Sequence, residues 1–296
     1  MQTEQEAEGG YLGQFIPLQY HHNMLMDSNR MIPFKAAIDC VVKPGAKVLE
    51  LGGGTGVLSW FAAAKAAKVW CVEFNPDLVA ESKKLLAMNP NGDKVEVVHA
   101  DAFAYLPPEP VDVMICEMIH VAMLREKQVA MVESFKQRYL ARFGGPLPTL
   151  VPAAALMAVQ PLQQDYHFEG YYAPIVQIQE LVQTQAGTVE MARPELYSIL
   201  DFTRETAPDI AWEGDFIMEH DGTVNALRFI TKNVLAVLLE SSSTIDWLNR
   251  YMAFPLARPV VVRKGDTLRV RFAYRAGGLI TELQEALRAD VVDVTV

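Results

Sequence analysis

The sequence predicts an α/β fold in which a domain built on a parallel sheet is followed by a mostly-β, barrel-like domain. From residue 47 onward, short runs rich in β-branched residues alternate with helical runs rich in Ala and Leu, which is typical of a parallel sheet with crossover helices. Glycines and prolines then cluster over residues 144–152, and Val- and Leu-rich runs with turn signals follow. A chain of 296 residues also fits about two domains of roughly 150 residues. We therefore expect an N-terminal helical segment over residues 1–30, the α/β domain over 31–150 and the β domain over 151–296.

The elements of the α/β domain follow one another in a regular order. Strands are expected at residues 47–51, 69–73, 94–98 and 111–116, and helices at 57–67 and from the Asn75-Pro76 start signal to about residue 86. Ligands of open parallel sheets bind at the carboxyl ends of the strands. The glycine cluster at residues 52–56, Glu73, Asp101 and Glu117 each follow a strand, so they should converge on one crevice.

The second half of the chain reads as antiparallel strands. Residues 224–230, 234–239 and 267–274 are the clearest of them, and turn signals lie at 221–222, 263–266 and 276–278. Residues 165–183 form an aromatic insertion that we expect to be helical.

Composition and charge exclude several classes of protein. With 36 acidic and 26 basic side chains the net charge is −10, which disfavours binding to nucleic acid. No apolar run approaches the roughly 18 residues of a membrane helix, and the first eight residues lack the basic and apolar regions of a secretory signal. The three cysteines have no CxxC spacing, and the histidines have no metal-ligand spacing. We expect a cytoplasmic protein with free thiols, no membrane association and no metal.

The glycine cluster points to a nucleotide-type cofactor. Gly52, Gly54 and Gly56 lack a Cβ where the backbone must approach a ligand closely. A dinucleotide fingerprint would place its third glycine at Val57, and a Walker loop would need Gly-Lys-Ser/Thr, which is absent. What remains is the E/D-x-G-x-G-x-G form beginning at Glu50, which suits S-adenosylmethionine in a Rossmann-like domain. S-adenosylhomocysteine would be the product.

Two acidic positions complete the expected cofactor site. Glu73, at the end of the second strand, is placed to accept hydrogen bonds from both ribose hydroxyls. Asp101, followed by Ala102 after the third strand, should lie beside the adenine edge.

The loop after the fourth strand carries a resemblance to a known family. Glu117 and Glu126 lie nine residues apart, and residues 116–126 resemble the double-glutamate loop of the protein arginine methyltransferases. Residues 11–15 resemble the family's Y-F-x-x-Y helix, and residues 222–227 and 264–266 resemble the strands of its β-barrel domain. The family's H-x-x-M-L-x-D-x-x-R segment is resembled by His21, Met24, Leu25, Asp27 and Arg30.

The resemblance implies roles for several of these residues. Glu117 and Glu126 would grip a guanidinium, and the physics agrees because a planar cation with a fork of N–H donors pairs bidentately with carboxylates. Arg30 would contact the cofactor carboxylate and buttress Glu117, with Met24 in the cofactor site and His21 near the cofactor or the acceptor. In the family, the region corresponding to residues 165–183 carries an arm that builds a dimer, so we expect a homodimer, although the aromatic residues there could instead form a wall of the acceptor pocket.

Four positions depart from the family pattern. Asp246, followed by Trp247, stands where the family has a histidine that helps to take the proton, and Phe15 replaces a tyrosine that would hold a carboxylate or the substrate. His120 replaces a glycine of the double-glutamate loop, and Ile119 replaces a methionine. One hypothesis is that His120 is the general base in place of the missing histidine. The alternative is that its ring only fills space in a rigid loop.

Three functions follow from these features. The first is methyl transfer from S-adenosylmethionine to a nitrogen acceptor of the arginine or amine type, in a protein, a peptide or a small molecule. The second is a small-molecule O-, N- or C-methyltransferase of specialised metabolism. The third is a cofactor-binding partner protein without turnover.

Overall fold

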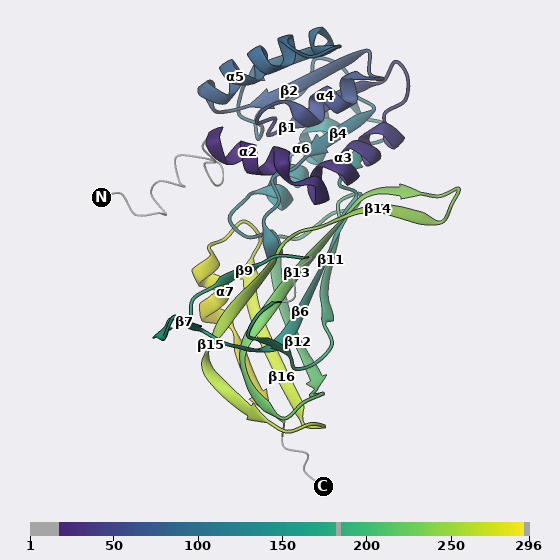
Figure 1. Ribbon diagram of the computed structural model, residues 1–296. Helices are drawn as coiled ribbons and strands as arrows, with labels where there is room; N and C mark the ends of the chain where they lie inside the picture. The colour runs from purple at the N-terminus through teal and green to yellow at the C-terminus, as the bar shows by residue number, and fades with distance from the viewer. Residues whose placement is uncertain (1–17, 182–184, 293–296) are drawn as a thin grey trace.

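The computed structural model describes residues 18–181 and 185–292 of the chain. An α/β domain forms one end of the molecule and an elongated antiparallel β domain forms the other (Figure 1). Helices α2 (Leu18–Met26) and α3 (Ser28–Val41) lie against the α/β domain where the two domains meet. This arrangement confirms the fold class that the sequence predicts.

The α/β domain is built on five parallel strands in the order β3-β2-β1-β4-β5. The four predicted strands are present within two residues of their expected bounds. The strands are β1 (Lys47–Leu51), β2 (Lys68–Glu73), β3 (Val95–His99), β4 (Val113–Cys116) and β5 (Thr149–Val151). The fifth strand was not predicted, because it follows the glycine and proline cluster that marks the end of the domain.

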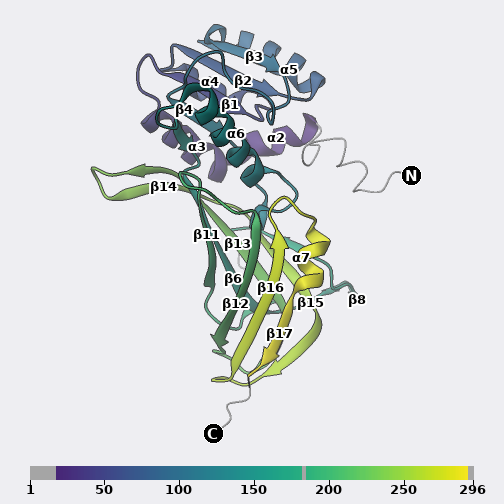
Figure 2. The same ribbon diagram turned by 180° about the vertical axis from the view of Figure 1, so that it is seen from behind.

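Helices cover the two faces of this sheet. Opposite views show α3 in front of the sheet on one side and α6 on the other (Figures 1 and 2). The helices are α4 (Val57–Ala63), α5 (Pro76–Ala87) and α6 (Gln128–Phe143), with short 3₁₀ turns η1 (Gly92–Lys94) and η2 (Val121–Met123). The predicted start of α5 is confirmed, since the Asn75 side chain accepts from the N–H groups of Asp77 and Leu78.

The boundary expected at residue 30 lies inside a helix. α3 runs from Ser28 to Val41, and Asp27 caps its start by accepting from the N–H of Arg30 at 3.3 Å. Pro33 does not end this helix. The N-terminal helical part of the chain is therefore longer than predicted, and its second helix packs against the β domain, with the rings of Phe34 and Trp247 5.5 Å apart.

The β domain contains a seven-stranded and a three-stranded antiparallel sheet. The first has the order β10-β6-β13-β15-β9, with β11 on β6 and β14 on β13, and the second has the order β12-β16-β17. Its elements are β6 (Ala154–Gln164), β9 (Gln177–Gln179), β10 (Thr188–Glu190), β11 (Glu195–Asp201), β12 (Asp209–Ile217), β13 (Gly222–Leu238), β14 (Ser243–Leu248), β15 (Tyr251–Val262), β16 (Thr267–Arg275), α7 (Ile280–Ala286) and β17 (Arg288–Val291).

The two strands predicted at 224–230 and 234–239 are one long strand, β13. The polar residues between them, Thr231 and Asn233, are fully buried. Aromatic rings also pack between the two sheets. The ring of Phe272 in β16 lies 5.1 Å from that of Tyr197 in β11 and 5.2 Å from that of Phe229 in β13. The polar residues Thr231 and Asn233 thus predict a break in a strand that the structure shows to be continuous.

The helix expected over residues 165–183 is wrong for the residues that the structure describes there. β7 (His167–Phe168) and β8 (Tyr171–Tyr172) form a small hairpin, and β9 follows it. Glu169 and Gly170 both have positive φ, 50° and 86°, which is the geometry of a tight hairpin turn and stops a helix. Within the described ranges, no helix is long and apolar enough to cross a membrane.

Candidate active site

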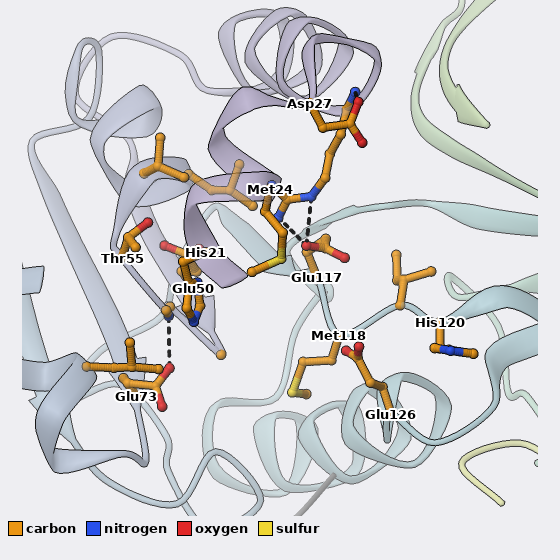
Figure 3. A pocket seen from close by; sticks show the side chains of 18 of the residues that line it. His21, Met24, Asp27, Glu50, Thr55, Glu73, Glu117, Met118, His120 and Glu126 are labelled. Atoms are coloured by element: carbon orange, nitrogen blue, oxygen red, sulfur yellow. Dashed lines mark hydrogen bonds and ion pairs between the residues drawn. The ribbon is translucent and has the colours of Figure 1, made fainter. Parts of the chain in front are cut away.

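A cavity of about 350 Å³ opens where β1, β2 and β4 end, and it extends to the β domain. Most of the predicted site residues line it, and Figure 3 shows them converging from the glycine loop, α2 and the double-glutamate loop. The predicted residues on its wall are His21, Met24, Arg30, Glu50, Gly52, Gly54, Glu73, Ala102, Glu117, His120, Glu126 and Trp247.

The glycine loop turns the chain sharply between β1 and α4. Gly52, Gly54 and Gly56 have φ values of 79°, 54° and 79°, which favour glycine. A Cβ at Gly52 would lie 3.0 Å from the Met118 side chain, and a Cβ at Gly54 would lie 2.9 Å from the His21 ring. Side chains at Gly52 and Gly54 would therefore crowd Met118 and His21, which also line the cavity.

Gly56 lies at the start of α4, and its role in cofactor binding stays a prediction. It is not among the residues that line the cavity, and it occupies the N-cap position of α4. A Cβ there would lie 3.1 Å from Leu86. Gly56 thus allows α4 to pack against α5, and it shapes the loop without facing the ligand space.

Glu73 and Glu50 accept hydrogen bonds from the glycine loop and from α4, respectively. The Glu73 carboxylate accepts from the Gly54 N–H and the Asn75 N–H, each at 2.8 Å, and its oxygens keep lone pairs for further donors. Glu50 is buried and accepts from the backbone N–H and the hydroxyl of Ser59. Burial raises the pKa of Glu50 to about 7, although the Ser59 hydrogen bonds act to lower it.

Asp101 is not among the residues that line the cavity, and its place beside the adenine edge stays a prediction. Its carboxylate accepts from the Phe103 N–H at 2.8 Å and so closes its own turn. Ala102, the next residue, lines the cavity instead. Arg138 of α6 donates to the carbonyls of Ala102 and Tyr105, which holds this turn in place.

Arg30 and Glu117 form the central ion pair of the site. Nε of Arg30 donates to Oε2 of Glu117 at 3.1 Å, and Nη2 donates to the same oxygen (Figure 3). Both side chains are about nine-tenths buried. The ion pair connects α3 to the loop after β4, and it supports the predicted buttressing of Glu117 by Arg30.

Glu126 lies in the same cavity without a basic side chain bonded to it in the described ranges. Loss of water and the neighbouring charge of Glu117 raise its pKa to about 8, although Arg30 and Arg125 act in the opposite direction. Two carboxyl groups from one loop thus share a cavity. Glu117 is paired with Arg30, whereas the surroundings of Glu126 favour its protonated form.

The β domain holds the double-glutamate loop in an unusual backbone conformation. Ala122, Met123 and Arg125 have φ values between 53° and 58°, which is strained for residues with a Cβ. The Ala122 N–H donates to Thr231 Oγ1 at 2.8 Å, and the Tyr274 hydroxyl donates to the Ala122 carbonyl at 2.9 Å. Backbone hydrogen bonds also join Met123 to Gly277 and Arg125 to Gly278. These contacts offset the strain and place Glu126 opposite Glu117.

Gln128 is a site residue that the sequence did not reveal. Its buried amide accepts from the Met118 N–H at 2.9 Å and donates to the Cys116 carbonyl at 2.8 Å, so it bonds to the residues on both sides of Glu117. The first residue of α6 thus fixes the loop backbone. A polar residue two positions after Glu126 carries no signal of this role in the sequence.

His21, Met24 and His120 lie where the sequence placed them, on the wall of the cavity. His21 is nearly buried beside the glycine loop. The His120 Nδ1 lies 3.1 Å from the Val121 carbonyl, and Figure 3 shows the ring directed away from the two carboxylates. The role of His120 as a general base stays a prediction.

The remaining predicted acceptor residues divide into three cases. Trp247 lines the cavity. Asp246 is not among the lining residues and pairs with Lys232 at 2.7 Å, and its role as a substrate contact stays a prediction. Phe15 lies outside the described residues. The aromatic residues 166–172 are also not on the cavity wall.

The residues present fit S-adenosylmethionine. The side-chain-free cradle at Gly52 and Gly54 leaves space beside the loop, and Glu73 reaches that space with oxygen acceptors suited to ribose hydroxyls. Arg30 supplies a cation suited to the cofactor carboxylate. These are the residues that would hold the cofactor.

Comparison with known proteins supports this interpretation. Residues 48–140 match a family model described as a methyltransferase domain. An uncharacterized protein of Methanocaldococcus jannaschii is 26% identical over 260 residues, which cover 88% of this chain and 93% of that protein. Protein arginine N-methyltransferase PRMT10 of Oryza sativa subsp. japonica is 30% identical over 158 residues, which cover 52% of this chain but only 40% of the rice protein.

A solved structure resembles nearly the whole fold. The Trypanosoma brucei PRMT1 enzyme-prozyme heterotetrameric complex with AdoHcy contains a chain that superposes with a TM-score of 0.70. The sequence identity is 18%, and the match covers 86% of this chain and 87% of that one. The chain therefore carries a class I, S-adenosylmethionine-dependent methyltransferase domain and resembles the protein arginine methyltransferases.

Proposed function

We propose that the protein transfers a methyl group from S-adenosylmethionine to a guanidinium nitrogen. One observation carries the proposal: Glu117 and Glu126 share the cavity that the cofactor loop opens into, and the pKa of Glu126 is raised to about 8. A cation bound beside Glu126 favours its carboxylate form, because the positive charge offsets both the loss of water and the charge of Glu117. A guanidinium also offers the fork of donors that two carboxylates can accept.

The chemistry follows from how these residues hold the acceptor. The cofactor supplies an electrophilic methyl group on its sulfonium. Glu117 and Glu126 draw positive charge toward two guanidinium nitrogens and leave electron density on the third, which forms the new N–C bond as the S–C bond to the methyl group breaks and leaves S-adenosylhomocysteine. Holding this nitrogen in line contributes most of the rate. The nitrogen also loses one proton. One hypothesis is that His120 on the same loop accepts it, and the alternative is that the His120 ring only fills space there.

Methyl-labelled cofactor with guanidinium acceptors tests the proposal. Glu117→Gln and Glu126→Gln should each lower transfer by about 100-fold or more, since each removes a charge that holds the acceptor. Glu285→Gln is the matched control, because Glu285 is exposed on α7 away from the cavity. Equal transfer by the wild type and both loop variants would contradict the proposal. Cofactor binding without transfer to any acceptor would favour the partner-protein alternative.

A further inference from the structure

Arg250 is a cation on the β-domain side of the cavity, and the proposed function does not use it. It precedes β15 and lines the same cavity as Glu117 and Glu126. Lys127 is also on the wall, but its ammonium donates to the Gly277 carbonyl at 2.6 Å. The cavity thus presents carboxylates on the α/β side and a guanidinium on the β side.

The chain around Arg250 runs along the cavity. Arg250 immediately precedes β15, and Met252, the second residue of that strand, lies on the cavity wall with it. Tyr251, between them, faces the opposite way and covers the guanidinium of Arg228 at 5.2 Å. Across the sheet, Met252 pairs in register with Ile178 of β9, another lining residue.

A buried polar network fixes this wall. Nε of Arg228 donates to Gln179 Oε1 at 2.8 Å, and its Nη1 donates to Gln160 Oε1 at 3.1 Å. Gln179 also donates to Gln164 Oε1 at 3.1 Å. These three glutamines and Arg228 are all nearly inaccessible to water. The network therefore fixes β9 beside the start of β15, where Arg250 precedes the strand.

The present contact of Arg250 is weak. Its Nη1 lies 3.3 Å from Glu180 Oε1, and both side chains are about half exposed. An exposed pair with one long contact contributes little to stability. In the described parts of the chain, Nε and Nη2 of Arg250 make no hydrogen bond. A ligand carboxylate can accept two parallel N–H bonds from a guanidinium and so replaces the Glu180 contact.

We propose that the acceptor is an arginine with a free α-carboxylate. Its guanidinium binds between Glu117 and Glu126, and its carboxylate binds Arg250. This inference rests on the proposed function, because it assumes that a guanidinium is methylated. Free arginine and the C-terminal arginine of a peptide share this chemistry.

Four acceptors separate the possibilities in a labelled-methyl assay. They are free arginine, agmatine, which is arginine without its carboxylate, a short peptide ending in arginine, and the same peptide with its arginine internal. The wild type should have a KM for free arginine at least tenfold below that for agmatine, since a charge-assisted bidentate contact is lost. If the natural acceptor is a chain end, the KM should be lower for the C-terminal peptide than for the internal one. If the natural acceptor is the small molecule, the KM should be lowest for free arginine.

Arg250→Gln identifies the residue responsible. It should raise the KM for free arginine about tenfold or more and leave the KM for agmatine unchanged. Arg258→Gln is the control, because Arg258 is exposed on the same strand and does not line the cavity. Calorimetric titration of both ligands into the protein saturated with S-adenosylhomocysteine should show the same difference in affinity without turnover.

Two results would overturn the inference and leave the proposed function intact. One is that the wild type has equal KM values for arginine and agmatine. The other is that Arg250→Gln raises both KM values by the same factor. Failure of the wild type to methylate any of the four guanidinium acceptors would overturn the proposed function and this inference with it.

Discussion

The ionisation of Glu126 sets the pH dependence that we expect for catalysis. Its pKa is raised to about 8 in the free protein, and a guanidinium acceptor stays charged throughout the accessible range. The carboxylate form is the one that binds a cation, so kcat/KM should rise with pH and level off above about 8. Initial rates from pH 6 to pH 9.5 measure this, and a flat profile would show that Glu126 does not control acceptor binding.

The same group has a predictable effect on stability. The ordinary pKa of a glutamate is 4.5, and the value in the folded chain is higher, so the folded state favours the protonated form. The stabilising contribution is present below pH 4.5 and is lost as the pH rises toward 8. Glu126→Gln cannot ionise, so its melting temperature relative to the wild type should be higher at pH 9 than at pH 5. Thermal unfolding at the two pH values checks the sign.

Gln128 should position Glu117 through the backbone. Gln128→Leu leaves the Met118 N–H and the Cys116 carbonyl without their partner, which should cost about 1–3 kcal/mol of stability and lower kcat. A change in kcat larger than the change in cofactor affinity would distinguish positioning from general loosening. Gln137→Leu is the control, because Gln137 is exposed on the same helix. Unchanged kcat in a folded Gln128→Leu variant would exclude this role.

At the scale of elements, strand β13 supports the double-glutamate loop from the other domain. Thr231→Val keeps the shape of the side chain and removes the acceptor of the buried Ala122 N–H. We expect a loss of about 1–3 kcal/mol and a reduced kcat, since the strained loop loses one of its supports. Chemical denaturation and labelled transfer measure the two effects. Thr244→Val, at an exposed position of β14, should change neither.

At the scale of the whole molecule, the hairpin β7–β8 carries exposed aromatic side chains. Phe168, Tyr171 and Tyr172 are 48%, 74% and 55% exposed, and Figure 1 shows the hairpin projecting from the β domain. The homodimer that the sequence predicts would bury these rings. Tyr171→Ser combined with Phe168→Ser should then shift the protein toward the monomer in light scattering, whereas Leu239→Ser at another exposed position should not. A wild-type monomer at high concentration would contradict the dimer.

The fold class and most of the cofactor half of the site were predictable from sequence. Strand periodicity, the glycine spacing and acids at strand ends are local signals, and β1, β2, Gly52, Gly54 and Glu73 all lie as predicted. The errors arose where local signals compete with packing. Strand β13 continues through buried polar residues, and the turn at Glu169-Gly170 replaces a helix.

The sequence by itself determined the residues of the double-glutamate loop and their spacing. Only the tertiary structure decided the ion pairing and the pKa of its two carboxyl groups. Arg30 bonds to Glu117 although 87 residues separate them in the sequence, and the loop is hydrogen-bonded to Thr231 and Tyr274 of the other domain. Arg250 likewise joins this cavity from the β domain, where it immediately precedes β15. A pKa and a strained backbone depend on neighbours in space, which spacing along the chain does not specify.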